Sequence, residues 1–406
     1  MNNKPKLRFK EFTTNYSEVK LSEITNRIKR KNRDLETSIP LTIASLEGLI
    51  DQREYFDKPI ASKDLSNYYL IYNGEFAYNK SYSKGYPVGS IKRLDKYSCG
   101  ALSTLYFCFN LKNNSPYNSD YLAQYFESTK WHKKVKNICA EGARNHGLLN
   151  VPVDEFYEIK HLLTSDAKEQ YKIAQFLQFY DMKIDNQRKK VKLLRERKDG
   201  ILNKLFKMKL RFNNEKFDDW NEVLLSNVLK ERKEKSKGNE DVYSVSVSKG
   251  LINQIEHLGR SYAAENTSNY NVVHEGDVIY TKSPTGEFKW GIVKQSNVNK
   301  NVIISPLYGV FIPLNKEIGY IVDAYFSSSI RAHNYLITQI RKGAKNTINV
   351  TNQEFLNKKI WLPSDTKEQK KISDFIRLLN DQISVEEMIL EKMILVKKGL
   401  LQKMFI

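Results

Sequence analysis

Each half of the chain carries one short motif whose residue types suit the reading of DNA bases. The motif is Gly-Ala-[Arg/Lys]-Asn, and its last two residues are Arg144-Asn145 in the first half and Lys345-Asn346 in the second. A glycine followed by a small residue predicts a tight turn, which presents a cation beside a side-chain amide. Arginine and lysine bind guanine edges, whereas asparagine binds adenine edges. A turn that only packs beneath the following helix is the alternative, and the residue types alone do not separate the two.

A second repeated motif places a lysine and a serine at the end of a predicted strand. Residues 74–81 and 276–283 each begin with a glycine and an acidic residue, continue as a strand and end in Lys-Ser. A glycine-containing loop follows each strand, and the first of these loops begins at Lys84. Side chains of these types bind phosphates and base edges. The candidate DNA-binding residues are therefore Lys80, Ser81, Lys84, Arg144, Asn145, Lys282, Ser283, Lys345 and Asn346.

The composition favours a polyanionic partner. The 406 residues include 66 Lys and Arg against 47 Asp and Glu, which gives a formal net charge of +19. Nucleic acid is the expected partner, because each phosphate that a lysine or arginine neutralises releases counterions. A basic but merely well-solvated surface is the alternative that charge leaves open. The longest apolar stretches, such as 101–109, are too short to span a membrane, and no apolar signal core follows the Lys-rich N-terminus.

The motifs of catalytic and metal sites are missing from the sequence. It has no Asn-Pro-Pro-aromatic tetrad for holding a flipped amine, no Gly-rich cofactor loop and no phosphate-binding Gly-Lys-Ser/Thr loop. Asp365 and Lys367 have the spacing of a nuclease pair, but they lie at a predicted helix cap. The six histidines and three cysteines show no ligand spacing, and the cysteines fit a reduced cytoplasm. We therefore expect no catalytic residue, no metal and no cofactor bound by this chain.

Two long helices are predicted to position these motifs. Residues 166–206 and 365–405 both follow a serine and open with Asp-x-Lys-Glu-Gln, which predicts a capping box such as that between Asp166 and Glu169. Apolar residues then recur at alternating spacings of four and three, as in a coiled-coil seam. Polar residues interrupt both seams at the same two levels, at Gln187 and Lys198 in the first helix. The seam residues are Ile173, Leu177, Tyr180, Ile184, Val191, Leu194, Ile201, Leu205, Ile372, Ile376, Leu379, Ile383, Leu390, Met393, Leu400 and Met404.

The two halves of the chain indicate an internal duplication. Every seam position in the second helix lies 199 residues beyond its counterpart in the first, as position 372 does beyond 173. The sequence Leu-Arg-Phe at 7–9 returns at 210–212, and predicted strands at 103–109 and 305–311 also match. Chance does not reproduce caps, polar interruptions and terminal sequences together. We expect two globular units on a shared scaffold, with two rods that pack antiparallel around a pseudo-twofold axis.

Taken together, these features resemble the specificity subunit of type I restriction–modification systems. The resemblance covers essentially the whole chain, and its most specific features are the paired Lys-Glu-Gln-x-x-Ile motifs that begin at Lys168 and Lys367. It implies an α+β fold with two duplicated target recognition domains separated by two long antiparallel coiled-coil helices. The implied bounds are 1–155 and 207–355 for the recognition domains, 156–206 for the central spacer helix and 356–406 for the C-terminal spacer helix.

The resemblance also implies a non-catalytic, cytoplasmic subunit that reads a bipartite, asymmetric target in double-stranded DNA, with one domain per half-site. Methyltransferase subunits would assemble on the paired helices, and restriction/translocase subunits would join the larger complex. Those partners, and not this chain, would use S-adenosylmethionine, ATP and Mg. The competing interpretations are a coiled-coil architectural protein that binds DNA without sequence specificity, and an enzyme with an unrecognised site. The first leaves two divergent globular units on one scaffold unexplained.

Overall fold

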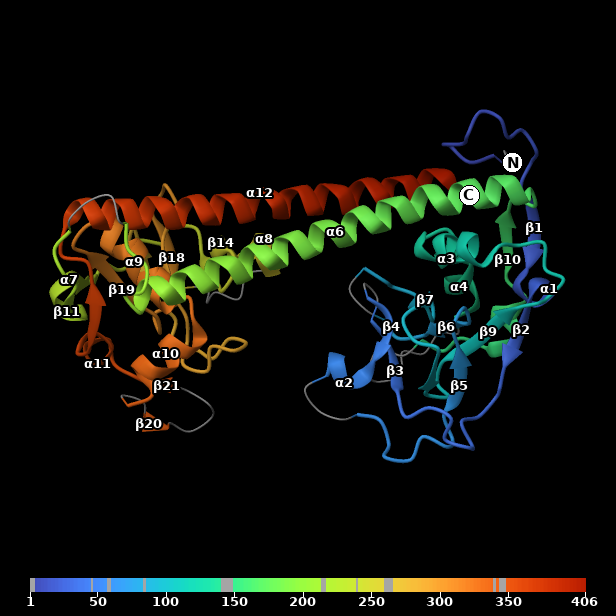
Figure 1. The fold of residues 1–406 in the computed structure, drawn as a ribbon, viewed down its shortest axis with the longest axis horizontal. Helices are drawn as coiled ribbons and strands as arrows, with labels where there is room; N and C mark the ends of the chain where they lie inside the picture. Colours follow the sequence, from blue (N-terminus) through green and yellow to red (C-terminus); the bar gives the residue numbers. More distant parts are fainter. Residues whose placement is uncertain are drawn as a thin grey trace. The chain divides into compact units, whose positions relative to one another are not determined.

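The computed structural model describes residues 4–44, 47–56, 60–82, 85–139, 149–212, 217–238, 240–258, 266–338, 341–342 and 348–406. They belong to two compact units. Unit 1 comprises Met1–Arg188 and Met388–Ile406, and unit 2 comprises Lys189–Glu387. Both units are α+β, and each includes part of both long helices, α6 (Ala167–Phe206) and α12 (Thr366–Met404) (Figure 1).

Among the residues described for unit 1, short strands form three sheets. The central sheet is antiparallel and has the order β2-β9-β6-β7, while a second sheet, β4-β3-β8-β5, contains the parallel pair β3–β8. The third pairs β1 with β10. The strands are β1 (Ser17–Lys20), β2 (Thr25–Ile28), β3 (Pro40–Ala44), β4 (Gly48–Asp51), β5 (Tyr69–Tyr72), β6 (Phe76–Asn79), β7 (Ser90–Arg93), β8 (Cys99–Leu102), β9 (Phe107–Leu111) and β10 (Lys160–Leu163).

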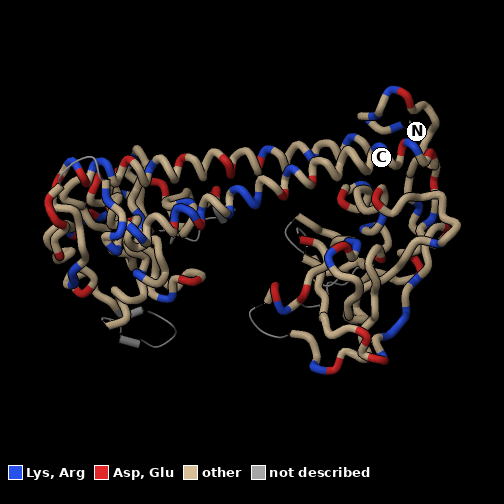
Figure 2. The backbone as a smooth tube through the Cα atoms, viewed as in Figure 1, with Lys and Arg blue, Asp and Glu red and all other residues tan. Residues whose placement is uncertain are grey.

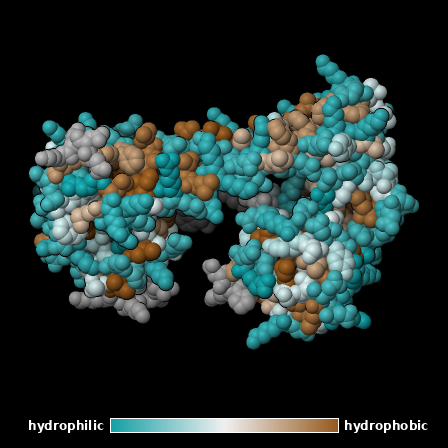
Figure 3. Space-filling view, viewed as in Figure 1, coloured by the Kyte–Doolittle hydropathy of each residue, from teal (hydrophilic) through white to brown (hydrophobic). Residues whose placement is uncertain are grey.

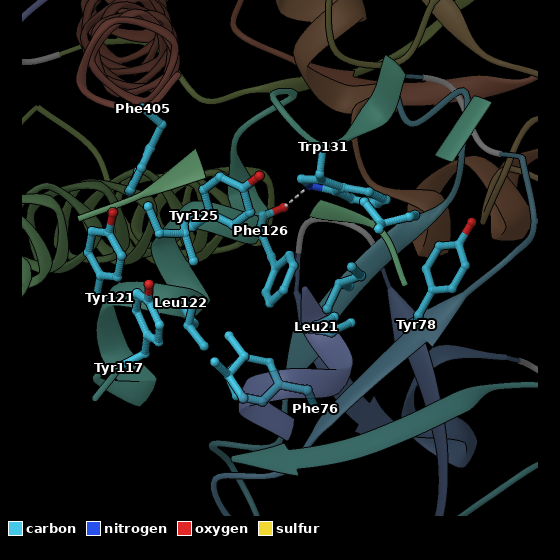
Figure 4. Close-up of a cluster of buried hydrophobic side chains, with 14 of the residues drawn as sticks. Leu21, Phe76, Tyr78, Tyr117, Tyr121, Leu122, Tyr125, Phe126, Trp131 and Phe405 are labelled. Atoms are coloured by element: carbon cyan, nitrogen blue, oxygen red, sulfur yellow. Dashed lines mark hydrogen bonds between the residues drawn. The ribbon is translucent and has the colours of Figure 1, made fainter. Parts of the chain in front are cut away.

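An aromatic core joins the central sheet and the β1–β10 pair of unit 1 to its helices (Figure 4). Phe405, which follows α12, packs on Tyr121 and Tyr125 of α3, with both pairs of ring centroids 5.5 Å apart. Trp131 donates its indole N–H to the carbonyl oxygen of Phe126 at 3.0 Å. The end of α12 is therefore anchored in this core. The shorter helices are α1 (Leu21–Ile24), α2 (Gln52–Tyr55), α3 (Ser119–Glu127), α4 (His132–Ile138) and α5 (Val153–Tyr157).

Unit 2 repeats the strand order of unit 1. Its four-stranded sheet is β12-β19-β16-β17, β11 pairs with β22, and β15 pairs with β18 as β5 pairs with β8. An isolated parallel bridge between Val242 and Ile303 links the hairpin β13–β14 to β18. In unit 1 the parallel pair β3–β8 has the equivalent place. The strands are β11 (Asn221–Leu224), β12 (Leu229–Glu231), β13 (Tyr243–Ser246), β14 (Gly250–Asn253), β15 (Asn271–Val273), β16 (Val278–Tyr280), β17 (Val293–Gln295), β18 (Val302–Ile304), β19 (Gly309–Pro313), β20 (Arg341–Lys342), β21 (Ile348–Asn349) and β22 (Lys359–Leu362).

The core of unit 2 is built in the same way as that of unit 1. Phe355 stacks on Tyr280 of β16 at 4.5 Å and on Phe311 of β19 at 5.3 Å between ring centroids. Leu202, near the end of α6, is completely buried in this core, as Leu401 of α12 is buried in the core of unit 1. The helices are α7 (Leu225–Val228), α8 (Gln254–Leu258), α9 (Lys316–Phe326), α10 (Ser329–Leu336) and α11 (Asn352–Leu356).

Within unit 1, the first part of α6 packs against the last part of α12, and the two segments run in opposite directions. Lys397 of α12 donates to the carboxylate of Asp181, while nearer the start of α6, Ile173 shares a core with Met404. The side chains of Lys397 and Ile173 are therefore both on the packed side of their helices. No helix among the described residues combines the length and the apolar surface needed to cross a membrane.

Within unit 2, the last part of α6 and the first part of α12 are paired in the same antiparallel sense. Lys190 forms an ion pair with Glu386 at 2.6 Å, and Leu205 shares a core with Ile372. Every predicted seam position in both helices is buried or half-buried. The 3,4 spacing in the sequence thus identified the packed side of each helix.

The start of α6 confirms one half of the predicted capping box and contradicts the other half. The carboxylate of Asp166 accepts the backbone N–H groups of Lys168 at 2.9 Å and Glu169 at 3.1 Å, as an N-cap should. The carboxylate of Glu169, however, does not return to the cap. It binds the guanidinium of Arg8, at 2.7 Å to Nε and 2.8 Å to Nη2. A bidentate, charge-assisted pair is stronger than a contact to one backbone N–H, so the arginine takes the carboxylate.

Candidate nucleic-acid interface

The glycine and acidic residue before each Lys-Ser strand are anchors of the sheet. In unit 1, Gly74 has φ +83°, and the carboxylate of Glu75 accepts the backbone N–H of Tyr72 and a guanidinium N–H of Arg30, both at 2.7 Å. A positive φ explains the glycine. The buried carboxylate next to it is neutralised by the arginine, so this turn fixes where β6 begins.

Unit 2 has the same anchor. Gly276 has φ +87°, and the carboxylate of Asp277 accepts the backbone N–H of His274 at 2.8 Å. Arg232 donates to both oxygens of that carboxylate, at 2.7 and 3.0 Å. Arg30 and Arg232 belong to two runs rich in lysine and arginine, 27–33 and 230–237. These two arginines stabilise the sheets.

Lys80 and Ser81 follow β6 directly. The ammonium of Lys80 lies 4.8 Å from the ring centroid of Phe107, the first residue of the neighbouring strand β9. The backbone carbonyl of Lys80 accepts the N–H of Leu149 at 3.0 Å, and the N–H of Ser81 is bound by the side chain of Asn79 at 3.0 Å. The backbone of the strand end is thus fixed, and the half-buried lysine side chain lies over an aromatic ring at the end of the two inner strands of the sheet.

Lys282 and Ser283 occupy the equivalent place after β16, but Lys282 has a different environment. Its φ is +53°, an unusual conformation for a residue with a side chain. Burial lowers the pKa of Lys282, although the nearby carboxylates of Glu231 and Glu354 act in the opposite direction. Lys282 therefore has acidic neighbours within unit 2, where Lys80 has an aromatic ring.

The loops after both strands return to the strand ends through a glycine. A side chain at Gly89 would place its Cβ 1.9 Å from the carbonyl oxygen of Asn79, and one at Gly291 would place it 2.8 Å from the backbone nitrogen of Lys282. Neither approach is possible for any other residue type. The Gly-containing loops that the sequence identified are therefore needed for this close packing.

The remaining candidate residues cannot be located relative to these strand ends. Lys84, Arg144, Asn145, Lys345 and Asn346 all lie outside the described residues. The structure therefore places the two Lys-Ser dipeptides at equivalent strand ends of the two units, and the DNA-reading role of the Gly-Ala-[Arg/Lys]-Asn motifs stays a prediction.

Two turns next to the Lys-Ser strand ends were predicted to be strand. The strands expected over 103–109 and 305–311 begin only at Phe107 and Gly309, because the residues before them form tight turns. In each turn the backbone N–H of the fourth residue donates to the carbonyl of the first, at 3.1 Å both from Tyr106 and from Tyr308. The sequence Ser-x-Leu-Tyr occurs in both turns and is the signal that sequence reasoning missed.

A buried ion pair ties the start of each long helix to the segment that precedes the first strand of the same unit. Besides Arg8, the carboxylate of Glu169 accepts the hydroxyl of Thr164 at 2.7 Å, and this hydrogen-bonded carboxylate raises the pKa of Arg8. In unit 2, Arg211 donates to both oxygens of Glu368, at 3.1 and 3.0 Å. Both glutamate side chains are fully buried. These pairs explain why Leu-Arg-Phe and Lys-Glu-Gln are repeated together, a link that the sequence alone did not suggest.

The described residues hold no group suited to a metal ion. No cluster of three or more His, Cys, Asp or Glu is formed among them. The three cysteines are free, and burial raises the pKa of Cys108 to about 12, so this thiol stays protonated.

Lysine and arginine are distributed over both units and along both long helices (Figure 2). Apolar side chains also appear as patches on the exposed surface of the long helices (Figure 3).

Comparison with known proteins points to one family. Residues 218–393 match the family described as "Type I restriction modification DNA specificity domain". No curated protein matches the chain in sequence. The chain is similar in fold to a type I restriction–modification S subunit from M. genitalium, with a TM-score of 0.56, 13% identity and 99% of each chain covered.

A second similar structure was solved in work on complex assembly and conformational transition of the type I R-M system. Its TM-score is 0.51 at 13% identity, and the match covers 97% of this chain and 98% of that chain. At these identities the two structures establish the similarity of fold. The family match over residues 218–393 is the independent evidence from sequence.

Proposed function

We propose that this chain belongs to the type I restriction modification DNA specificity family and is the DNA-recognition subunit of a type I restriction–modification complex. The observation that carries the proposal is the family match over residues 218–393. The strand order of unit 2, β12-β19-β16-β17, recurs in unit 1 as β2-β9-β6-β7, outside the matched segment. A second domain of the same kind in the first half of the chain accounts for that recurrence.

In this proposal the two domains are duplicated target recognition domains, at 1–155 and 207–355, and each reads one half of a bipartite DNA target. The spacer segments, at 156–206 and 356–406, contain α6 and α12, and these helices form an antiparallel coiled coil with a pseudo-twofold axis. Support comes from the buried side of α6 and α12, where the seam residues of the two helices lie. Base contacts come from the ends of the sheets, including Lys80, Ser81, Lys282 and Ser283, because cations and hydroxyls there suit phosphates and base edges.

The chemistry of the complex resides in its partners. Methyltransferase subunits assemble on the helices and use S-adenosylmethionine, while restriction/translocase subunits use ATP and Mg. The chain itself is non-catalytic and works in the cytoplasm. The missing cofactor motifs of the sequence support this division of labour. A non-specific coiled-coil DNA-architectural protein, the competing interpretation, has no support from the family match, which is to a specificity domain.

Mapping modified adenines in a genome that carries this chain and its partner subunits tests the proposal. We expect one bipartite sequence to be modified throughout the genome, and this modification to disappear when the gene for this chain is deleted. Modification that persists at the same sequence without the chain would refute the proposed role.

A further inference from the structure

Each unit presents one leucine to solvent at the same place in its sheet. The side chain of Leu105 in unit 1 is 60% exposed, and that of Leu307 in unit 2 is 72% exposed. A single exposed leucine is ordinary on a protein surface and needs no explanation. Its recurrence at equivalent positions of two units whose sequences have diverged does need one, because an exposed leucine contributes little to folding.

The same hydrogen bonds hold both leucines in fixed turns. In unit 1, the backbone N–H of Leu105 donates to the hydroxyl of Ser103 at 3.4 Å, and the N–H of Tyr106 donates to the Ser103 carbonyl at 3.1 Å. The corresponding distances in the turn 305–308 are 3.3 and 3.1 Å. Since the serine hydroxyl is engaged in the turn, the leucine side chain is what the turn offers to a partner.

A lysine lies at the same end of the central sheet as each leucine. Since β6 and β9 are antiparallel, the end of β6, which Lys80 follows, and the start of β9, which the turn 103–106 precedes, lie at one end of these strands. The ammonium of Lys80 lies over the ring of Phe107, the first residue after this turn. Lys282 and the turn 305–308 have the same relation to β16 and β19. Each unit therefore has a fixed apolar tip and a cation at the same end of its central sheet.

We propose that Leu105 and Leu307 each contact the C5-methyl group of a thymine in the major groove, one in each half-site of the target. The inference rests on the proposed function and assigns it two specificity-determining residues. The lysine at the same end of each sheet suits a DNA phosphate or a guanine edge, which agrees with DNA as the partner of the turn. Among the groups that bases present in the major groove, the thymine methyl is the apolar one, and a leucine can distinguish bases only through such a group.

The test uses the full chain in its complex with methyltransferase subunits and a duplex that contains the mapped target. Leu105→Ala and Leu307→Ala are compared with Leu314→Ala. Leu314 is 71% exposed and follows β19 at the end opposite to the turn, so it is a matched control. Affinity for the target is measured by fluorescence anisotropy, and each thymine is replaced in turn by deoxyuridine, which lacks only the methyl group.

We expect each turn variant to bind the target about fivefold more weakly, with unchanged affinity for random DNA, while Leu314→Ala binds normally. One deoxyuridine position in each half-site should weaken the unaltered protein to the same extent and have no further effect on the matching leucine variant. Unchanged affinity of the leucine variants would overturn the inference. A loss that no deoxyuridine reproduces would also overturn it, because it indicates a wedge between bases or a contact with protein. Absence of any preference for the target in the unaltered complex would instead contradict the proposed function itself.

Discussion

Units 1 and 2 share their anchors and differ in the residues around them. The Arg30–Glu75 and Arg232–Asp277 pairs hold equivalent turns, and equivalent buried pairs bind the starts of α6 and α12. At other equivalent positions the side chains of the two units differ in charge or polarity. The comparison teaches that buried, hydrogen-bonded ion pairs fix the scaffold. Loss of one partner would leave an unpaired buried charge, which is strongly destabilising. The positions around these pairs differ between the two units.

Two matched positions show this variation within the scaffold itself. His161 of β10 has Ile360 of β22 as its counterpart, and both side chains are buried. Asp181 of α6, which binds Lys397, has Asn380 of α12 as its counterpart, and Asn380 donates to the hydroxyl of Tyr320 at 2.8 Å instead. Lys198 of unit 2 is the counterpart of Lys397, and the position equivalent to Asp181 is therefore an amide in unit 2.

The largest expected effect comes from breaking the buried pairs at the helix starts. Arg8→Met should destabilise unit 1, and Arg211→Met should destabilise unit 2, each by about 3–5 kcal/mol, because a buried carboxylate loses its cation. The loss of stability should be greater for Arg211→Met, because the carboxylate that remains has a weaker hydrogen bond. Glu368 accepts the indole N–H of Trp220 at 3.2 Å, whereas Glu169 accepts the hydroxyl of Thr164 at 2.7 Å. Hydrogen exchange read separately for the two units measures both effects.

The control for this prediction removes the carboxylate charge as well. Arg8→Met combined with Glu169→Gln should recover part of the lost stability of unit 1, because the buried charge is then absent. If Arg8→Met left exchange in unit 1 unchanged, the pair would be a surface contact of no structural weight.

The next effect is a different response of the two units to acid. Burial lowers the pKa of His161 to about 3, and its Nδ1 lies 2.9 Å from the hydroxyl of Tyr125. The unfolded chain has the ordinary histidine pKa of about 6.5, so it binds a proton that the folded unit excludes. The contribution of neutral His161 to stability is therefore intact above pH 6.5 and is lost progressively as the pH falls toward 3. The slope is about 1.4 kcal/mol per pH unit.

The matched variant for this prediction is supplied by unit 2. His161→Ile, which copies Ile360, should make the stability of unit 1 less dependent on pH between 6.5 and 4 in urea unfolding followed by hydrogen exchange. An equally steep loss of stability in the variant would assign the acid response to other groups, such as His132, whose pKa burial lowers to about 4.

The smallest effect concerns Lys198, which has Asn380 at the position equivalent to Asp181. Burial, and next the charge of Lys294, lower the pKa of Lys198, although the carboxylates of Asp323 and Asp199 act in the opposite direction. Asn380→Asp should supply the missing carboxylate and stabilise unit 2 by about 1 kcal/mol in urea unfolding at pH 7. Asp181→Asn in unit 1 is the reverse exchange and should cost a similar amount. A destabilised Asn380→Asp variant would show that the hydrogen bond to Tyr320 matters more than the charge of Lys198.

Several parts of this structure were predictable because they depend on local patterns. The heptad spacing identified the packed side of both long helices, and Asp166 was correctly predicted as an N-cap. The repeated Gly-acid strands gave β6 and β16, since a glycine at positive φ before an apolar run is a local signal. The match to type I restriction modification specificity domains was also anticipated from the repeated motifs.

Other parts depend on contacts that are distant in sequence. Glu169 was assigned to a capping box because a carboxylate three residues after an N-cap usually serves there. Its actual partner, Arg8, is 161 residues away. The turns at Ser103 and Ser305 were predicted as strand because the aromatic residues that follow have a high strand propensity. The hydrogen bonds of each serine to the backbone favour a turn instead. Leu202 and Leu401 were not predicted to be core residues. The heptad pattern shows which side of a helix packs on the other helix, but not which other side packs on a globular unit.

Exchange of one proposed recognition domain tests the central claim most directly. Residues 1–155 are replaced by the equivalent region of a relative with a different target, and modified adenines are mapped in a host that supplies the methyltransferase subunits. If each domain reads its own half-site, one half of the modified sequence changes to that of the relative and the other half is retained. A chimera that assembles and modifies DNA but alters both halves, or neither, would contradict the assignment of one half-site to each domain.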